Sequence, residues 1–218
     1  MCFSATASFG AGILLSATAV VAMKKTKEPK QRVFAAIPLL FAVQQIAEGF
    51  VWLGLLHQEF KGGLQLATYI FLIFAQVVWA LWIPLSLLLL EKEPHRKRIL
   101  QVLLGAGIGV AIYHGYGLFS HTVTGTDVDC HIHYNVQYLS EYRLLSGAGY
   151  GLATIVPCFI SGVKRMWWLG AAFLLSYIAT QFYYDYYVVS IWCYFAALLS
   201  VIVIVILHGM NKQPATVA

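Results

Sequence analysis

The sequence predicts an all-α polytopic membrane protein, a bundle of seven transmembrane helices, and three observations support this fold class. The first is composition: the 218 residues are 60% hydrophobic and only 11% charged, with a mean hydropathy of +0.75. Soluble domains carry about 25% charged residues and roughly 45–50% apolar ones. This composition therefore excludes a soluble enzyme, a nucleic-acid-binding domain and a disordered chain.

The second observation is a series of apolar runs long enough to cross a membrane. A transmembrane helix needs about 20 mostly apolar residues, because about 30 Å of hydrocarbon is crossed at about 1.5 Å per residue. The first run is no cleaved signal peptide, because its lysines follow it instead of preceding it. We assign the spans to 4–23, 33–56, 64–90, 99–119, 144–163, 167–187 and 189–208. Only Val188 separates the last two, so this boundary is the least defined.

The third observation is the placement of the basic residues. All but Lys61 and Arg143 of the 14 Lys and Arg residues follow the first, third or fifth span or lie in the tail. Cytoplasmic loops carry the excess of Lys and Arg, so the N-terminus is predicted outside and the C-terminus in the cytoplasm. The chain is then one domain, 1–218, with an external loop at 120–143 and a short cytoplasmic tail at 209–218. A cell membrane is the expected location.

Glycine and proline residues mark where the helices approach one another or bend. Gly105, Gly107 and Gly109 in the fourth span allow close packing of helix backbones. Pro38, Pro84 and Pro157 are expected to kink the second, third and fifth spans. We interpret these residues as packing features and not as chemistry.

Polar side chains inside the spans gather toward the predicted external leaflet. Glu48 lies about eight residues from the external end of its span and shares a face with Gln44, with Gln45 beside it and Trp52 one turn further out. His114 lies in the external half of the fourth span, and Gln181, Tyr184 and Asp185 follow one face of the sixth. Ionisable residues at this depth are expensive and indicate function. The pattern predicts a polar site that opens outward and is closed at its cytoplasmic base.

A metal ion is the first chemistry that these residues suggest. The predicted ligands are Glu48, His114 and Asp185 with His131 or His133 of the external loop, a donor set that zinc or another transition metal accepts. A bound water would then attack an ester or amide presented from the outer leaflet. In this scheme Glu48 is a general base or ligand, and Gln44, Gln45, Gln181, Tyr184 and Trp52 bind the substrate. For the loop cluster 130–133, a solvated loop with a disulfide-bonded cysteine is an equal alternative.

Other chemistries are less well supported by the sequence. Retinal would need a lysine in the seventh span, which has none, and a two-histidine haem would draw on His57 and His114. A serine nucleophile would need a paired base, and Ser146 beside Arg143 is not interpreted as such a pair. Seven-span zinc hydrolases of the adiponectin-receptor and alkaline-ceramidase group are similar in architecture only, because the last span here has a single histidine, His208, at the wrong end.

Two roles of Cys2 are consistent with the sequence. A Cys2–Cys130 disulfide would tie the N-terminus to the external loop, where oxidation is permitted. Removal of Met1 would instead leave Cys2 with a free amine beside its thiol, either a metal chelator or a nucleophile with its own base. Cys2 is therefore a second candidate catalytic residue.

The opening Met1-Cys2-Phe3-Ser4-Ala5-Thr6-Ala7-Ser8-Phe9 and the segment Gln44-Gln45-Ile46-Ala47-Glu48-Gly49 resemble an uncharacterised family of small bacterial multi-span membrane proteins. The resemblance implies several spans and no known activity. The predicted function is hydrolase-type chemistry on a membrane lipid or small amphiphile. The alternative is a non-enzymatic protein that binds or transports a metal ion, haem or small solute. No nucleic-acid partner is expected, and a second copy of the chain is a candidate partner.

Overall fold

The computed structural model describes residues 4–128, 131–136, 143–183 and 195–212. The described chain is mainly helical, as predicted. The boundary near Val188 lies outside these residues. In chain order the elements are α1 (Ala5–Lys24), α2 (Pro29–Ala35), α3 (Ile37–Leu56), η1 (Gln58–Phe60), α4 (Lys61–Ile73), the π-helical η2 (Phe74–Val78), α5 (Trp79–Leu90), α6 (Pro94–Ser120), β1 (Thr124–Val128), β2 (His131–Asn135), α7 (Arg143–Thr154), α8 (Val156–Ile160), α9 (Met166–Tyr183) and α11 (Ala196–Lys212).

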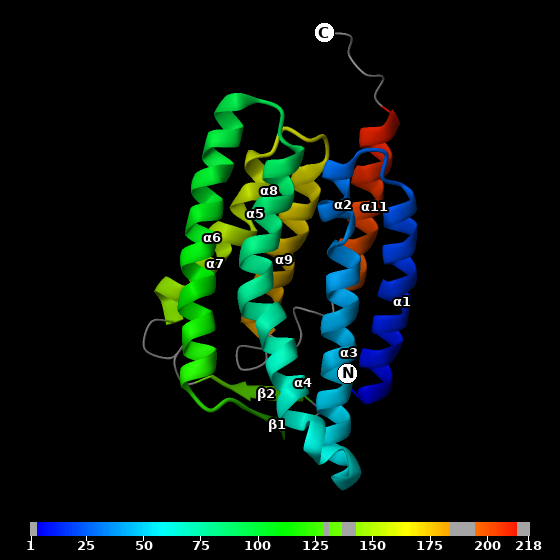
Figure 1. The fold of residues 1–218 in the computed structure, drawn as a ribbon, viewed down its shortest axis with the longest axis vertical. Coiled ribbons are helices and arrows are strands. Elements are labelled where there is room, and N and C mark those ends of the chain that lie inside the picture. The colour runs from blue at the N-terminus through cyan, green and yellow to red at the C-terminus, as the bar shows by residue number, and fades with distance from the viewer. Residues whose placement is uncertain (1–3, 129–130, 137–142, 184–194, 213–218) are drawn as a thin grey trace.

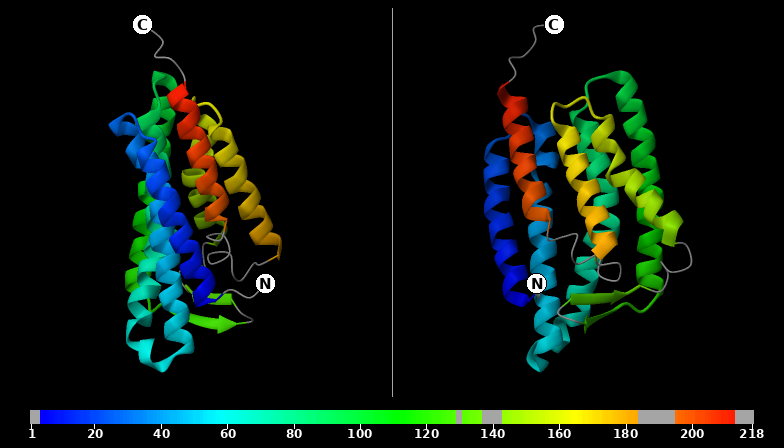
Figure 2. Two further views of the ribbon diagram at one scale, coloured as in Figure 1. Left: turned by 90° about the vertical axis from the view of Figure 1, so that its right-hand side faces the viewer. Right: turned by 180° about the vertical axis from the view of Figure 1, so that it is seen from behind.

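The helices run side by side as an elongated bundle, with a small hairpin across one end and the C-terminus at the other (Figures 1 and 2). By length and composition, four helical stretches are able to cross a membrane: Ala5–Lys24, Pro29–Leu56, Gln58–Leu90 and Pro94–Ser120. Shorter apolar helices occupy Leu145–Ile160, Met166–Ile178 and Ala196–Asn211. These seven stretches overlap the seven predicted apolar runs.

Two of the three prolines interrupt their spans and one does not. The helix breaks at Ala36 before Pro38 and at Ile155 before Pro157, and each proline lies in the first turn of the helix that follows. A proline in the first turn removes no hydrogen bond, because an N–H group at that position has no acceptor within its helix. Pro84 lies inside α5, which continues through it. Because Pro84 has no N–H, the carbonyl of Ala80 loses its usual helical donor.

The freed Ala80 carbonyl is the point where α6 comes closest to α5. A Cβ atom added at Gly107 would overlap the carbonyl oxygen of Ala80, whereas Gly105 and Gly109 face open space. Glycine is thus required at one of the three predicted positions. A glycine Cα–H beside a carbonyl oxygen at a helix interface is a weak attractive contact. Pro84 and Gly107 together explain the close pairing of these two helices.

The loop at 120–143 contains an element that the sequence did not predict. β1 and β2 form an antiparallel hairpin in which Gly125 pairs with Tyr134 and Asp127 with Ile132. Ile132 and Tyr134 are buried, and the Tyr134 ring stacks on Phe71 with 4.8 Å between ring centroids. The hairpin therefore closes this end of the bundle with apolar side chains.

The buried side chains form two apolar clusters with polar groups between them. One cluster lies toward the C-terminal end of the bundle and includes Phe41, Ile83 and Leu103. The other lies under the hairpin and includes Val51 and Leu118. Along α3, the π-helical segment and α6, the buried polar residues fall between the two clusters; they are Gln44, Gln45, Glu48, Gln76 and His114. We refer to these five residues as the polar layer.

The loops rich in Lys and Arg gather at the end away from the hairpin. The Glu91 carboxylate accepts a hydrogen bond from the backbone N–H of Gly162 at 2.7 Å, which joins the loop after α5 to the loop after α8. Gln31 donates to the Asn211 side-chain oxygen at 3.2 Å, and Asn211 donates to the carbonyl of Lys25. One end of the bundle thus collects the basic loops and the end of α11 (Figure 1).

Removal of the Glu93 cap is expected to destabilise α6 in a pH-dependent manner. The Glu93 carboxylate accepts from the backbone N–H groups of Arg96 at 2.8 Å and His95 at 2.9 Å, and these bonds hold its pKa below the ordinary value of 4.5. A lowered folded-state pKa means that the stabilisation exists above the unfolded-state pKa and is lost as pH falls through the folded-state value. Thermal unfolding in detergent should show a lower Tm for Glu93→Ala than for wild type at pH 7.

The difference in Tm between Glu93→Ala and wild type should shrink as the pH falls through the lowered folded-state pKa of Glu93. Glu28→Ala is the matched control, because Glu28 occupies the same N-cap position of α2 and its side chain makes no capping bond. Equal shifts for the two variants at pH 7 would contradict a specific role for the Glu93 cap.

Candidate functional site

The polar face of α3 is buried and hydrogen-bonded. Glu48 is 3% exposed, and its carboxylate accepts from the side-chain amide of Gln45 at 3.1 Å. The Gln44 side-chain oxygen accepts from the Trp79 indole N–H at 2.7 Å. The Gln44 oxygen is therefore engaged in holding α3 against α5. One turn beyond Glu48, the buried indole N–H of Trp52 has no hydrogen-bond partner within the described residues.

A π-helical segment interrupts the third span opposite this face. In η2 the backbone bonds run to the fifth residue instead of the fourth, which widens the helix and turns carbonyls outward. Two of these carbonyls are taken up by side chains. The Tyr150 hydroxyl donates to Ala75, and the Nδ1 atom of His114 lies 3.3 Å from the carbonyl oxygen of Gln76. π-helical turns are frequent at functional sites.

The contacts of His114 define its tautomer. The Gln76 carbonyl can only accept a hydrogen bond, so Nδ1 carries the proton. In the neutral imidazole the Nε2 atom then has a free lone pair, and the Ser146 hydroxyl lies 2.6 Å from it. Ser146 therefore donates to His114. The Tyr150 ring stacks on the imidazole with 6.0 Å between ring centroids and an interplanar angle of 14°.

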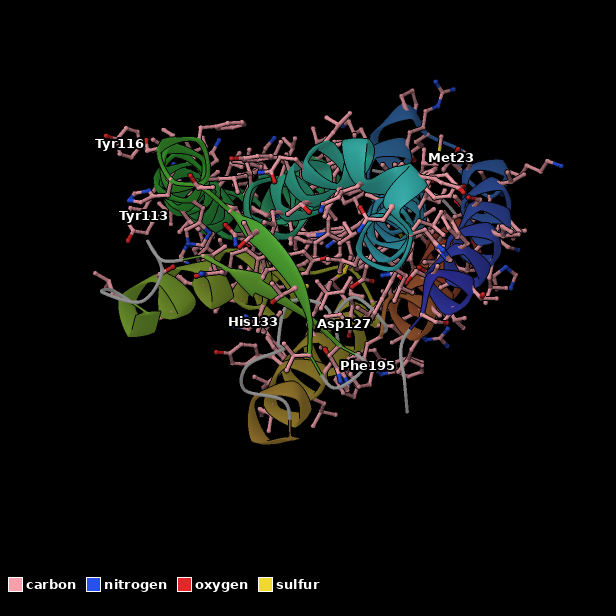
Figure 3. All side chains as sticks on the ribbon, turned by 90° about the horizontal axis from the view of Figure 1, so that it is seen from below. Met23, Tyr113, Tyr116, Asp127, His133 and Phe195 are labelled. Carbon is pink, nitrogen blue, oxygen red and sulfur yellow. The ribbon has the colours of Figure 1, made fainter. Side chains whose placement is uncertain are left out.

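The Ser146–His114 pair lies at the edge of the bundle between α6 and α7. His114 is 4% exposed, but Ser146 is only partly buried, in the first turns of α7. Leu145 beside it is 73% exposed, and Tyr113 and Tyr116 of α6 are exposed on the same edge (Figure 3). The serine hydroxyl is thus reachable from the side of the bundle, while the hairpin covers the end.

The predicted metal ligands are only partly described by the structure. Cys2, Tyr184, Asp185 and the side chain of Gln181 lie outside the described residues. His131 and His133 are half-buried and alternate along β2 with Ile132 and Tyr134. Within the described residues, no three His, Cys, Asp or Glu side chains are grouped to hold a metal ion. Both ring nitrogens of His114 have protein partners, so a metal there would have to displace one of them.

Ser146 is the residue that the sequence analysis passed over. It was set aside because Arg143, its nearest charged neighbour in sequence, is no base. The structure instead pairs it with a histidine 32 residues earlier in the chain. A signal was available: His114 and Ser146 lie near the predicted external ends of consecutive, antiparallel spans. That places the two residues at a similar depth.

The comparisons with known proteins give a family and no activity. The model of a family of unknown function, DUF6629, matches residues 1–218. No curated protein and no solved structure gives a significant match. The match covers the whole chain, so this protein belongs to DUF6629, which fits the expectation of an uncharacterised family.

Proposed function

We propose that this chain spans a bacterial inner membrane seven times, with its N-terminus outside and its C-terminus in the cytoplasm. The support is the division of charge between the two ends of the bundle. The loops containing Lys27, Lys92 and Arg165 gather at one end and the hairpin at the other (Figure 1). A cytoplasmic excess of Lys and Arg orients membrane proteins, so the hairpin end faces outward.

The topology predicts which introduced cysteines react from outside. In a background without native cysteines, Thr126→Cys on the hairpin and Lys92→Cys in the opposite loop are both at exposed positions. A membrane-impermeant maleimide added to intact cells should label Thr126→Cys and leave Lys92→Cys unlabelled. Both should react after the cells are opened. Labelling of Lys92→Cys in intact cells would reverse the orientation.

The proposed activity is hydrolysis of an ester or amide bond in a membrane lipid or small amphiphile. The single observation that carries it is the hydrogen bond of 2.6 Å from the Ser146 hydroxyl to His114 of the polar layer, in the half of the bundle nearer the hairpin. Polar groups in this part of a membrane protein are costly and mark a site. The exposed apolar side chains around Ser146 suit a substrate that arrives through the lipid.

Purified protein in lipid nanodiscs should therefore hydrolyse p-nitrophenyl esters, and esters with longer acyl chains should be better substrates because they partition into the bilayer. The control is the same protein with His114→Gln, which keeps the size of the side chain. Absence of hydrolysis with every chain length, or equal rates for the variant, would remove the proposed activity.

A bound transition metal such as zinc is a second candidate feature of the outer site. The observation in its favour is that His131 and His133 lie on one side of β2, where each offers an imidazole nitrogen. Elemental analysis after gentle purification would then find about one metal per chain, and the His131→Ala/His133→Ala variant would lose it. If the purified protein contains no metal and binds none at micromolar metal concentrations, the metal hypothesis is wrong.

Binding of a small solute without chemistry remains the alternative function. It is favoured by the buried Trp52 indole N–H, which has no partner within the described residues. A solute with an acceptor oxygen would complete this hydrogen bond. Trp52→Phe should then weaken solute binding, because it removes this N–H donor.

A further inference from the structure

We infer that Ser146 is the nucleophile of this site, that His114 is its general base, and that Tyr150 is a positioning residue. The inference deepens the proposed function by assigning its mechanism, and it rests on that function only for the choice of an ester or amide substrate. Nothing in the sequence or the family assigns a role to these three residues.

The geometry meets the requirement for an activated serine. A nucleophile and its base should lie within about 2.6–3.2 Å, and a third group should orient the base. The Ser146 hydroxyl lies 2.6 Å from His114 Nε2, and the Gln76 carbonyl fixes the opposite side of the ring at 3.3 Å. The orienting group is a backbone carbonyl where many hydrolases use a carboxylate.

The π-helical segment is the device that supplies this carbonyl. In a regular helix the Gln76 oxygen would accept from a backbone N–H four residues later. Tyr150 holds the neighbouring Ala75 carbonyl through its hydroxyl and covers the imidazole with its ring. One side chain of α7 therefore fixes both the carbonyl segment and the plane of the base.

The reaction balances with water as the only co-reactant. The proton of the Ser146 hydroxyl moves to His114 Nε2 while the serine oxygen bonds to the substrate carbonyl carbon. The bond to the leaving alcohol or amine breaks, and that group takes the proton from Nε2. Water then attacks the acyl-serine, gives its proton to Nε2, and releases the acid as the serine regains its proton. The other ring proton stays on His114 Nδ1 throughout, donated to the Gln76 carbonyl oxygen.

Access to Ser146 indicates the class of substrate. Leu145 is exposed, as are Gly147 and Ala148 on the following turn. Beside Ser146, α7 thus presents one large apolar side chain, Leu145, and two small residues. A substrate with an acyl chain in the lipid and its ester group near the outer surface fits this approach. A charged, water-soluble peptide does not.

An alkyl fluorophosphonate tests the assignment directly. An activated serine displaces fluoride and forms a stable bond to phosphorus, and digestion with mass spectrometry locates the modified residue. Wild-type protein in nanodiscs should be labelled on Ser146, and Ser146→Ala should abolish labelling. His114→Gln should slow labelling by about 10²-fold or more, the usual contribution of a general base. Tyr150→Phe, which keeps the ring and removes the hydroxyl, should slow it by about 10-fold.

Ser176→Ala is the matched control, because the Ser176 hydroxyl donates to the carbonyl of Phe173 within its own helix. It should be labelled at the wild-type rate, and gel filtration should show that all variants remain folded. Failure to label the folded wild type, or labelling at a serine other than Ser146, overturns the nucleophile. An unchanged rate in Tyr150→Phe overturns its positioning role.

The experiment separates this inference from the proposed function. Ester hydrolysis that persists in Ser146→Ala keeps the function and overturns the nucleophile. Labelling of Ser146 in a protein that hydrolyses no ester supports the nucleophile and removes the proposed substrate class. If a metal chelator does not change the rate of labelling, the serine is activated without a metal ion.

Discussion

Gly107→Ala is expected to destabilise the protein by about 2–4 kcal/mol, which corresponds to a fall in Tm of roughly 5–15 °C in a chain of this size. The added methyl group would overlap the carbonyl oxygen of Ala80, a backbone atom that cannot rotate away. α6 would have to move away from α5. Pro84 has no N–H, so the Ala80 carbonyl has no helical donor. Moving α6 away from α5 would therefore also remove the contact of this carbonyl with the Cα–H group of Gly107.

Gly105→Ala and Gly109→Ala are the matched controls, two residues to either side in the same helix. Both positions face open space, so alanine should be neutral or stabilise α6 by up to about 1 kcal/mol through helix propensity. The measurement is thermal unfolding in detergent, followed by circular dichroism. A Gly107→Ala protein as stable as these controls would contradict the close approach of α5 and α6.

The helices could be predicted from the sequence because a membrane demands long apolar segments. Hydropathy alone locates Ala5–Lys24 to within one residue and Pro94–Ser120 to within five, because both helices are long and apolar enough to cross a membrane. The charge bias also placed the basic loops together. The hairpin could not be predicted in the same way. Its buried residues, Ile132 and Tyr134, alternate over only five positions, and Tyr134 is buried by packing on Phe71, which is distant in the sequence.

The sequence shows which polar residues fall within apolar runs, and the structure buries three of them, Glu48, Gln44 and His114. Pairing is not readable from sequence. The partner of His114 depends on where the π-helical segment turns the Gln76 carbonyl and on which face of α7 meets α6. Neither of these two features produces a periodic pattern in the sequence. A small polar residue such as Ser146, next to Gly147, is also typical of helix packing.

Glu91→Ala is expected to cost about 2–4 kcal/mol, because one buried carboxylate joins the loop after α5 to the loop after α8. Glu91 is 9% exposed and accepts hydrogen bonds from the backbone N–H groups of Gly162 at 2.7 Å, Lys92 at 3.0 Å and Glu93 at 3.1 Å. A hydrogen bond to a charged group contributes about 1.5–3 kcal/mol, and a buried donor left without its acceptor adds a desolvation penalty. The Gly162 N–H bears most of that penalty.

The replacement Glu91→Gln separates charge from hydrogen bonding. The amide keeps one acceptor oxygen for Gly162 and loses the charge. The stability of Glu91→Gln should therefore lie between that of wild type and that of Glu91→Ala. Glu28→Ala serves again as the control, since Glu28 lies in the first loop at the same end and makes no capping bond. Proteolysis of the loops 91–93 and 161–165 in detergent should become faster only in the Glu91 variants. If both loops stay protected and Tm is unchanged in Glu91→Ala, the carboxylate does not join them, and the apolar cluster beneath them must hold this end alone.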